Sequence, residues 1–157
     1  MTTQEATGWR DVALRDRQME WGAGGPRCDI DHLIVEYDWG VPMALVEYKT
    51  NDAEYPKKDD WNRMAVAKLG DMAGLPSFCC QYTRDWLWWR LTPWNELAKK
   101  WIPTQRVLDE RQYVQFQYKL RGKTAPEEIL ATRKVNPATD QERKERAGSV
   151  YKVKEGG

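Results

Sequence analysis

Asp31, Glu47 and Lys49 have the types and the spacing for metal-assisted chemistry on a phosphate ester. Residues two apart in a β-strand point to the same face, so we expect Glu47 and Lys49 to share a face and Tyr48 to point to the other. Carboxylates that converge on one point bind Mg²⁺. The metal polarises a phosphoryl oxygen and lowers the pKa of a bound water, and a neighbouring lysine can orient that water or offset charge on the phosphate. The three residues therefore predict hydrolysis of a phosphodiester bond.

Two apolar segments with a tight turn between them must bring these residues together. Segments 30–37 and 41–49 contain the continuous apolar runs Leu33–Val35 and Ala44–Val46, which are typical of strands buried on both faces. The three residues between the segments are short enough for an antiparallel hairpin. Such pairing places the start of the first strand beside the end of the second, and it brings Asp31 close to the Glu-x-Lys pair.

The sequence resembles the PD-(D/E)XK nuclease superfamily over about residues 9 to 92. The stretches DIDHLIV at 29–35 and LVEYK at 45–49 carry the resemblance, with fifteen residues between Asp31 and Glu47. They are most similar to the nuclease-related and resolvase-like branches, whose pattern is acid-Ile-Asp-hydrophobic followed by hydrophobic-Glu-x-Lys. The chain departs from the family in two places. No proline stands directly before the acid, and the following helix lacks the glutamine-tyrosine signature of the RecB-like exonucleases.

The resemblance implies a fold, a metal and a substrate. The fold would be α/β (α+β), a central mixed β-sheet flanked by helices with a restriction-endonuclease-like αβββαβ core. Asp31, Glu47 and the backbone carbonyl of Tyr48 would bind Mg²⁺, for which Mn²⁺ can substitute. Glu20 on a preceding helix would complete the metal site, and Lys49 would be catalytic. The substrate would be DNA, cut by a small phage-type endonuclease rather than an exonuclease. We expect a homodimer, because cutting two strands with one site each requires two copies, and no nucleotide cofactor.

Five basic residues are candidates for phosphate contacts, which position DNA without reading its sequence. They are Arg15, Arg17, Lys57, Lys58 and Arg63. A solvated helical face is an equally good interpretation of the first two. Residues 1–98 carry 11 basic and 16 acidic side chains (net −5), and residues 99–157 carry 14 and 8 (net +6). The basic residues of the tail could therefore add non-specific affinity for DNA, although acidic residues are interleaved with them.

Other interpretations of the same residues stay open. Glu47 and Lys49 could form a weak ion pair on a solvated strand face, and Asp29 could act in place of Asp31 or cap the strand. Glu20 could be a solvated charge at a helix end. The chain as a whole could be a nuclease-fold module that binds DNA or protein without catalysis, or a tryptophan-rich interaction protein.

The length of 157 residues fits one domain, and 41% hydrophobic with 31% charged residues is a globular balance. We expect a nuclease-like domain over residues 1–122 and a charged C-terminal extension over 123–157. No apolar run approaches the roughly 20 residues that a membrane span needs. No secretory signal is visible at the N-terminus, so we expect a cytoplasmic protein that does not contact membranes.

The remaining pattern predicts helices and strands in alternation. A helix over 9–21 precedes the hairpin, and a helix capped by Asp59 or Asp60 runs to about Ala73 with Gly74 behind it. Residues 77–82 and 86–91 are expected to be strands. Residues 94–101 and the stretch after Pro126 are expected to be short helices. Residues 113–120 alternate as a strand would, but Asp109 as a cap and Gly122 at the end favour a helix.

Aromatic, histidine and cysteine residues have mainly structural interpretations. Alternation along 86–91 puts Trp86 and Trp88 on one face of a strand and Trp89 on the other, and core packing is favoured over base stacking. His32 is expected to be packed or hydrogen-bonded. Cysteines 28, 79 and 80 have no metal-ligand spacing, so reduced, buried thiols are expected.

Overall fold

The computed structural model describes residues 30–136 and seven single positions outside that range: Ala13, Asp16, Arg17, Glu20, Trp21, Glu142 and Glu145. Within the predicted helix over 9–21, four of these positions are helical, and the remainder of that prediction lies outside the described residues. Arg15, Cys28, Asp29 and most of the basic tail also lie outside them.

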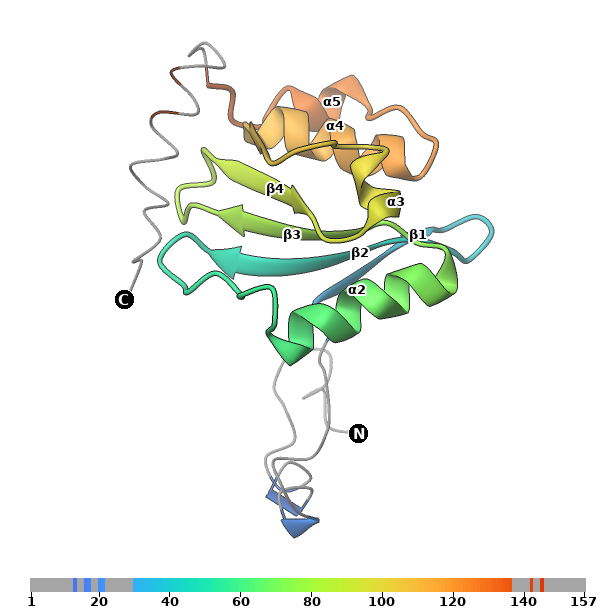
Figure 1. Cartoon of the computed structure of the whole chain (residues 1–157). Helices are drawn as coiled ribbons and strands as arrows, with labels where there is room; N and C mark the ends of the chain where they lie inside the picture. Colours follow the sequence, from blue (N-terminus) through green and yellow to red (C-terminus); the bar gives the residue numbers. More distant parts are fainter. Residues whose placement is uncertain are drawn as a thin grey trace.

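Five strands form one mixed sheet in the order β1-β2-β3-β4-β5. They are β1 (His32–Glu36), β2 (Val41–Thr50), β3 (Ser77–Tyr82), β4 (Trp89–Pro93) and β5 (Arg106–Leu108). Among these described strands β2 and β3 form the one parallel pair, and α2 (Trp61–Ala73) makes the crossover between them. Figure 1 shows α2 over one face of the sheet and α4 (Glu110–Leu120) with α5 (Glu127–Leu130) over the other. Helix α3 (Glu96–Lys99) follows β4. The predicted class, a mixed sheet flanked by helices, is confirmed.

Strand alternation divides the core into two layers. On the α4 face, Phe78 and Leu91 pack with Tyr113 and Leu120 of the helix. On the α2 face, Leu45 and Cys79 pack with Val66 and Trp94. The Glu-x-Lys pair of β2 belongs to the α2 face, because Glu47 and Lys49 are in phase with Leu45.

Helix α2 confirms the predicted helix and packs on the sheet through a glycine. The Asp60 side chain accepts a hydrogen bond from the backbone N–H of Arg63, and Gly74 ends the helix at φ +71°. The helix approaches β3 through Gly70, where a Cβ atom would lie 2.0 Å from Ser77 Oγ. The larger apolar residues of this helix face solvent instead: Trp61, Met64, Leu69 and Met72. Close approach of the helix backbone, rather than a bulky apolar stripe, joins α2 to the sheet.

Two predictions about the strands are wrong. Leu33 is 46% exposed because β1 is an edge strand, whereas the run Ala44–Val46 in the sheet interior is buried as expected. The strand expected at 86–91 begins at Trp89, since Trp86 lies in the preceding turn with φ +66°. Consequently Trp86 and Trp89 lie together, with stacked rings, and Trp88 is buried with Val107.

The C-terminal part of the described chain is helical. Helix α4 begins with a capping box between Asp109 and Gln112, which decides the ambiguous stretch 113–120 in favour of a helix. Helix α5 follows Pro126 as expected and buries Leu130. The three-residue strand β5 was not predicted.

Two further predictions about the architecture stay predictions. The division of the chain at residue 122 is one of them, although α5 beyond it packs on α4. The αβββαβ core is the other, because two strands lie between residue 30 and α2, and residues 22–29 are outside the described range. No helix in the described part of the chain is long and apolar enough to cross a membrane.

Candidate active site

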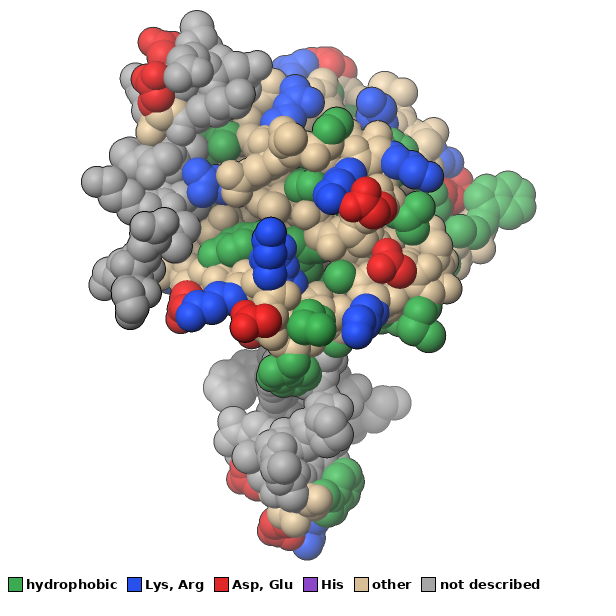
Figure 2. All heavy atoms as spheres, in the orientation of Figure 1, with side chains coloured by type: hydrophobic (Ala, Val, Ile, Leu, Met, Phe, Trp, Pro, Cys, Tyr) green, Lys and Arg blue, Asp and Glu red, His purple; other side chains and the backbone are tan. Residues whose placement is uncertain are grey.

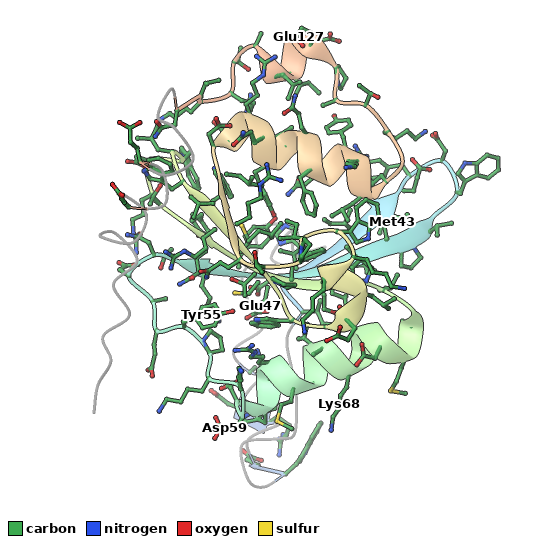
Figure 3. The ribbon with its side chains drawn as sticks, turned by 45° about the horizontal axis from the view of Figure 1, so that its top comes forward. Met43, Glu47, Tyr55, Asp59, Lys68 and Glu127 are labelled. Atoms are coloured by element: carbon green, nitrogen blue, oxygen red, sulfur yellow. The ribbon has the colours of Figure 1, made fainter. Side chains whose placement is uncertain are left out.

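The hairpin brings Asp31 to Glu47. Antiparallel pairing sets His32 opposite Val46, so Asp31 stands at the level of Glu47 on the neighbouring strand. The Asp31 carboxylate accepts a hydrogen bond of 2.8 Å from the backbone N–H of Tyr48. In Figure 3, Glu47 and Tyr55 both lie on the α2 side of the sheet. Glu127 lies on the opposite side, at α5. The prediction that Asp31 lies close to the Glu-x-Lys pair is confirmed.

Glu47 is a buried carboxylate, and one of its two oxygens has no hydrogen-bond partner. The residue is 4% exposed. Its Oε1 atom pairs with Lys49 Nζ at 3.0 Å, whereas its buried Oε2 atom has no hydrogen-bond partner. Burial raises the pKa of the Glu47 carboxyl, the charge on Asp31 raises it further, and the bond to Lys49 only partly opposes them. An oxygen in this state is suited to a cation.

Lys49 keeps its charge beside these carboxylates. Partial burial lowers its pKa, but the hydrogen bond to Glu47 and the charges of Glu47 and Asp31 outweigh that effect, so the pKa of Lys49 is raised. The Lys49 side chain is 30% exposed. A cation therefore stands at the edge of the site, where it meets both the carboxylates and solvent.

Two polar residues that the sequence analysis did not single out continue this site across the sheet. Lys49 is in register with Gln81 on β3, and Gln81 is in register with Arg90 on β4. Strand register puts all three on the α2 face. Gln81 is buried and Arg90 is half-buried. These three side chains form a polar row across the sheet, next to the carboxylates, where the apolar interior of the α2 face stops.

A groove of about 480 Å³ opens from Lys49 along the loop between β2 and α2. Lys57 lines it together with Tyr55 and Asp59. Lys58 is exposed but is not among the lining residues. The structure therefore brings Lys49 and Lys57 to one groove.

The other residues predicted to contact phosphate do not line this groove, and two of them, Arg63 and Arg17, already interact with other groups of the chain. Arg63 donates a hydrogen bond to the Pro56 carbonyl and lies over the rings of Tyr55 and Trp94. Arg17 and Glu20 form an exposed pair with each other at 2.8 Å. Arg15 lies outside the described residues.

The residues present fit a hard divalent cation. Two carboxylates face one another, and the N–H and C=O groups of a strand residue point to the same side. The Tyr48 carbonyl is thus directed to the side of Asp31. Among the described residues no group of three or more His, Cys, Asp or Glu side chains is placed to hold a metal. Mg²⁺ is commonly held by one or two carboxylates with several waters, so the pair is sufficient for it.

His32 and the cysteines are not part of the carboxylate and lysine site. His32 packs edge-on against Tyr48, with ring centroids 4.8 Å apart, on the face opposite Glu47. Cys79 and Cys80 are free and buried, as expected. Burial raises the pKa of the Cys79 thiol to about 12, so it stays protonated.

In comparisons with known proteins, no family model, curated protein or solved structure matches this chain.

Proposed function

We propose that this chain is a metal-dependent phosphodiesterase of the PD-(D/E)XK type that hydrolyses DNA, as an endonuclease rather than an exonuclease. The observation that carries the proposal is the buried Oε2 atom of Glu47, which has no hydrogen-bond partner and stands beside Asp31. A solvated ion pair would not bury its carboxylate to 4% exposure. A buried carboxylate oxygen is costly unless something binds it.

Each residue has a distinct task in this proposal. Asp31, Glu47 and the Tyr48 carbonyl would hold Mg²⁺ or Mn²⁺, which polarises a phosphoryl oxygen and lowers the pKa of a bound water. The hydrogen bond from Tyr48 N–H fixes the Asp31 carboxylate before substrate arrives. Lys49 offsets negative charge on the phosphate, and its raised pKa keeps it protonated for that purpose.

The surface charge is consistent with a modest affinity for DNA. Figure 2 shows lysine and arginine side chains interspersed with acidic and hydrophobic ones, without a continuous basic patch on this face. Binding would then rest on few phosphate contacts, Lys57 in the groove among them, and would weaken with salt in proportion to their number. A homodimer and a cytoplasmic location belong to the same proposal.

Cleavage of supercoiled plasmid and branched DNA in Mg²⁺ or Mn²⁺ tests the proposal. Wild type is compared with Lys49→Ala and Glu47→Ala. Lys99→Ala serves as the control, because Lys99 also pairs with a glutamate but on an exposed helix. We expect the wild type and the control to cut and the two site variants to fail while staying folded.

Two results would count against the proposal. If the wild type cuts with neither metal, the fold is a binding module without catalysis. If Lys49→Ala and Glu47→Ala cut as fast as the wild type, the site is wrong.

A further inference from the structure

A second cavity, of about 420 Å³, lies on the other face of the sheet, between the ends of β2 and β3 and helix α4. Its size is within the roughly 300–1,000 Å³ of small-molecule sites. Aromatic rings make up half of its wall, from Tyr48, Tyr82, Trp86, Trp89 and Tyr113. Tyr113 belongs to the core and Tyr48 and Trp89 pack against it. Neither the core nor the proposed hydrolytic site explains why the exposed ring of Trp86 joins them.

Four of the rings are nearly parallel. Trp89 stacks on Tyr113 at 4.8 Å and 9°. Tyr82, Trp86 and Trp89 lie 5.6–6.0 Å from one another with interplanar angles of 13–24°. Rings that enclose an ammonium ion stand around it, whereas parallel rings form a platform on which another flat ring can stack. The geometry favours a planar aromatic ligand.

Trp86 is held at the open side of this platform in an unfavourable conformation. Its backbone has φ +66°, a region that costs a non-glycine residue free energy. The turn maintains it: the Asp85 carboxylate accepts bonds from Thr83 Oγ1 and Leu87 N–H, and the Trp86 carbonyl accepts from Trp89 Nε1. The side chain nevertheless remains 46% exposed. Strain that leaves a large ring exposed over a cavity is the pattern of a ligand contact.

The polar groups of the cavity exclude a phosphate and admit a neutral ring. The hydroxyls of Tyr48 and Tyr113 share a hydrogen bond, and Gln117 Nε2 donates to Tyr48. Asp31 and Glu110 contribute carboxylates to the wall and His32 contributes an imidazole, and among the described residues no lysine or arginine lines this cavity. A nucleobase, which is flat, neutral and rich in hydrogen-bonding groups, meets these conditions.

Asp31 lines this cavity and also stands beside Glu47. A base on the platform would therefore lie next to a phosphate at the carboxylate pair. We propose that the aromatic cavity holds the base of an unpaired nucleotide, stacked on Trp86 and Trp89, so that the substrate is DNA with a single-stranded segment or end. That the bound nucleotide belongs to a DNA substrate rests on the proposed function. That the cavity holds a base rests on the cavity alone.

The test measures binding without cleavage. A fluorescently labelled single-stranded oligonucleotide and the same sequence in a blunt duplex are titrated with the full chain in EDTA, by anisotropy. We expect the single strand to bind more tightly. Trp86→Ala should weaken its binding about 5- to 150-fold, the range that one stacked base gives, and Trp86→Phe should restore most of it. Trp39→Ala, which removes an exposed ring at the far end of the hairpin, should have no effect.

A competition arm separates the two sources of a base. A deoxynucleoside monophosphate that displaces the oligonucleotide only at far higher concentration supports the DNA assignment. One that binds in a Trp86-dependent manner while the oligonucleotide does not bind shows a free-nucleotide site and overturns that assignment. Binding that is insensitive to Trp86, or equal for single strand and duplex, overturns the inference even if the protein cuts plasmid. Trp86-dependent binding without cleavage in any metal would refute the hydrolysis alone.

Discussion

The Asp31 carboxylate accepts a 2.8 Å hydrogen bond from the backbone N–H of Tyr48, the residue between Glu47 and Lys49. The contact ties the start of β1 to the end of β2. Asp31 itself is exposed, so without this bond its side chain could rotate away into water. Its fixed position also places a negative charge near Glu47 and contributes to the raised pKa there. Two carboxylates held in this way repel one another, and a cation between them would relieve that repulsion.

The stability of the metal-free protein should depend on the ionisation of Glu47. Its pKa is raised above the ordinary 4.5 in the folded chain, chiefly by burial. The folded state therefore holds a proton that the unfolded state releases, and stability falls as the pH rises from about 4.5 through the folded pKa. Each unit of such a shift corresponds to about 1.4 kcal/mol. We expect Glu47→Gln to be more stable than the wild type to urea at pH 7 in EDTA and equal to it near pH 4.

The matched control for this prediction is Glu96→Gln. Glu96 also pairs with a lysine, but its side chain is exposed. Its replacement should change stability by no more than about 0.5 kcal/mol at either pH. A Glu47→Gln protein that is less stable than the wild type at pH 7 would mean that the ion pair with Lys49 outweighs burial.

Gly70→Ala should destabilise the fold although it improves the helix. Alanine is better than glycine by about 1 kcal/mol in a helix interior. At this position, however, a Cβ atom would meet Ser77 Oγ at 2.0 Å and the Leu75 carbonyl at 2.8 Å, inside a buried contact. Such overpacking costs about 1–3 kcal/mol. Urea denaturation should show a net loss, and a gain in stability would show that α2 does not approach β3 this closely.

Trp86 offers a comparison between two variants that both remove its ring. At φ +66° an alanine keeps the backbone strain, whereas a glycine does not. We therefore expect Trp86→Gly to be about 1–2 kcal/mol more stable than Trp86→Ala. Thermal unfolding of the two variants side by side measures the difference. Equal stabilities would indicate that residue 86 leaves the left-handed region once the indole is gone.

Local signals made the hairpin and α2 predictable. A short turn over residues 37–40 joins β1 to β2, and the cap at Asp60 and the glycine at 74 delimit the helix. The hairpin placed an acid at the start of its first strand beside Glu47, and the family resemblance favoured Asp31 over Asp29 for that position. Features of this kind depend on residues close in sequence, so they can be predicted without knowing the strand order.

Features that depend on strand order or register could not be predicted in the same way. Leu33 and Leu45 lie in similar apolar runs, and only the edge position of β1 exposes the first. Gln81 and Arg90 join Lys49 only because β2 and β3 are parallel and in register. The left-handed backbone at residue 86 has no glycine or asparagine to signal it, so the stretch 86–91 looked like a continuous strand.

Calorimetric titration of Mg²⁺ into the full chain at pH 7.5 tests most directly whether Asp31 and Glu47 form a metal site. The wild type should bind the ion at one site, and Asp31→Asn and Glu47→Gln should each weaken binding roughly tenfold or more. Glu96→Gln should behave like the wild type. If all four proteins take up Mg²⁺ alike, or none does so with Mn²⁺ either, the carboxylate pair is not a metal site and the proposed hydrolysis loses its basis.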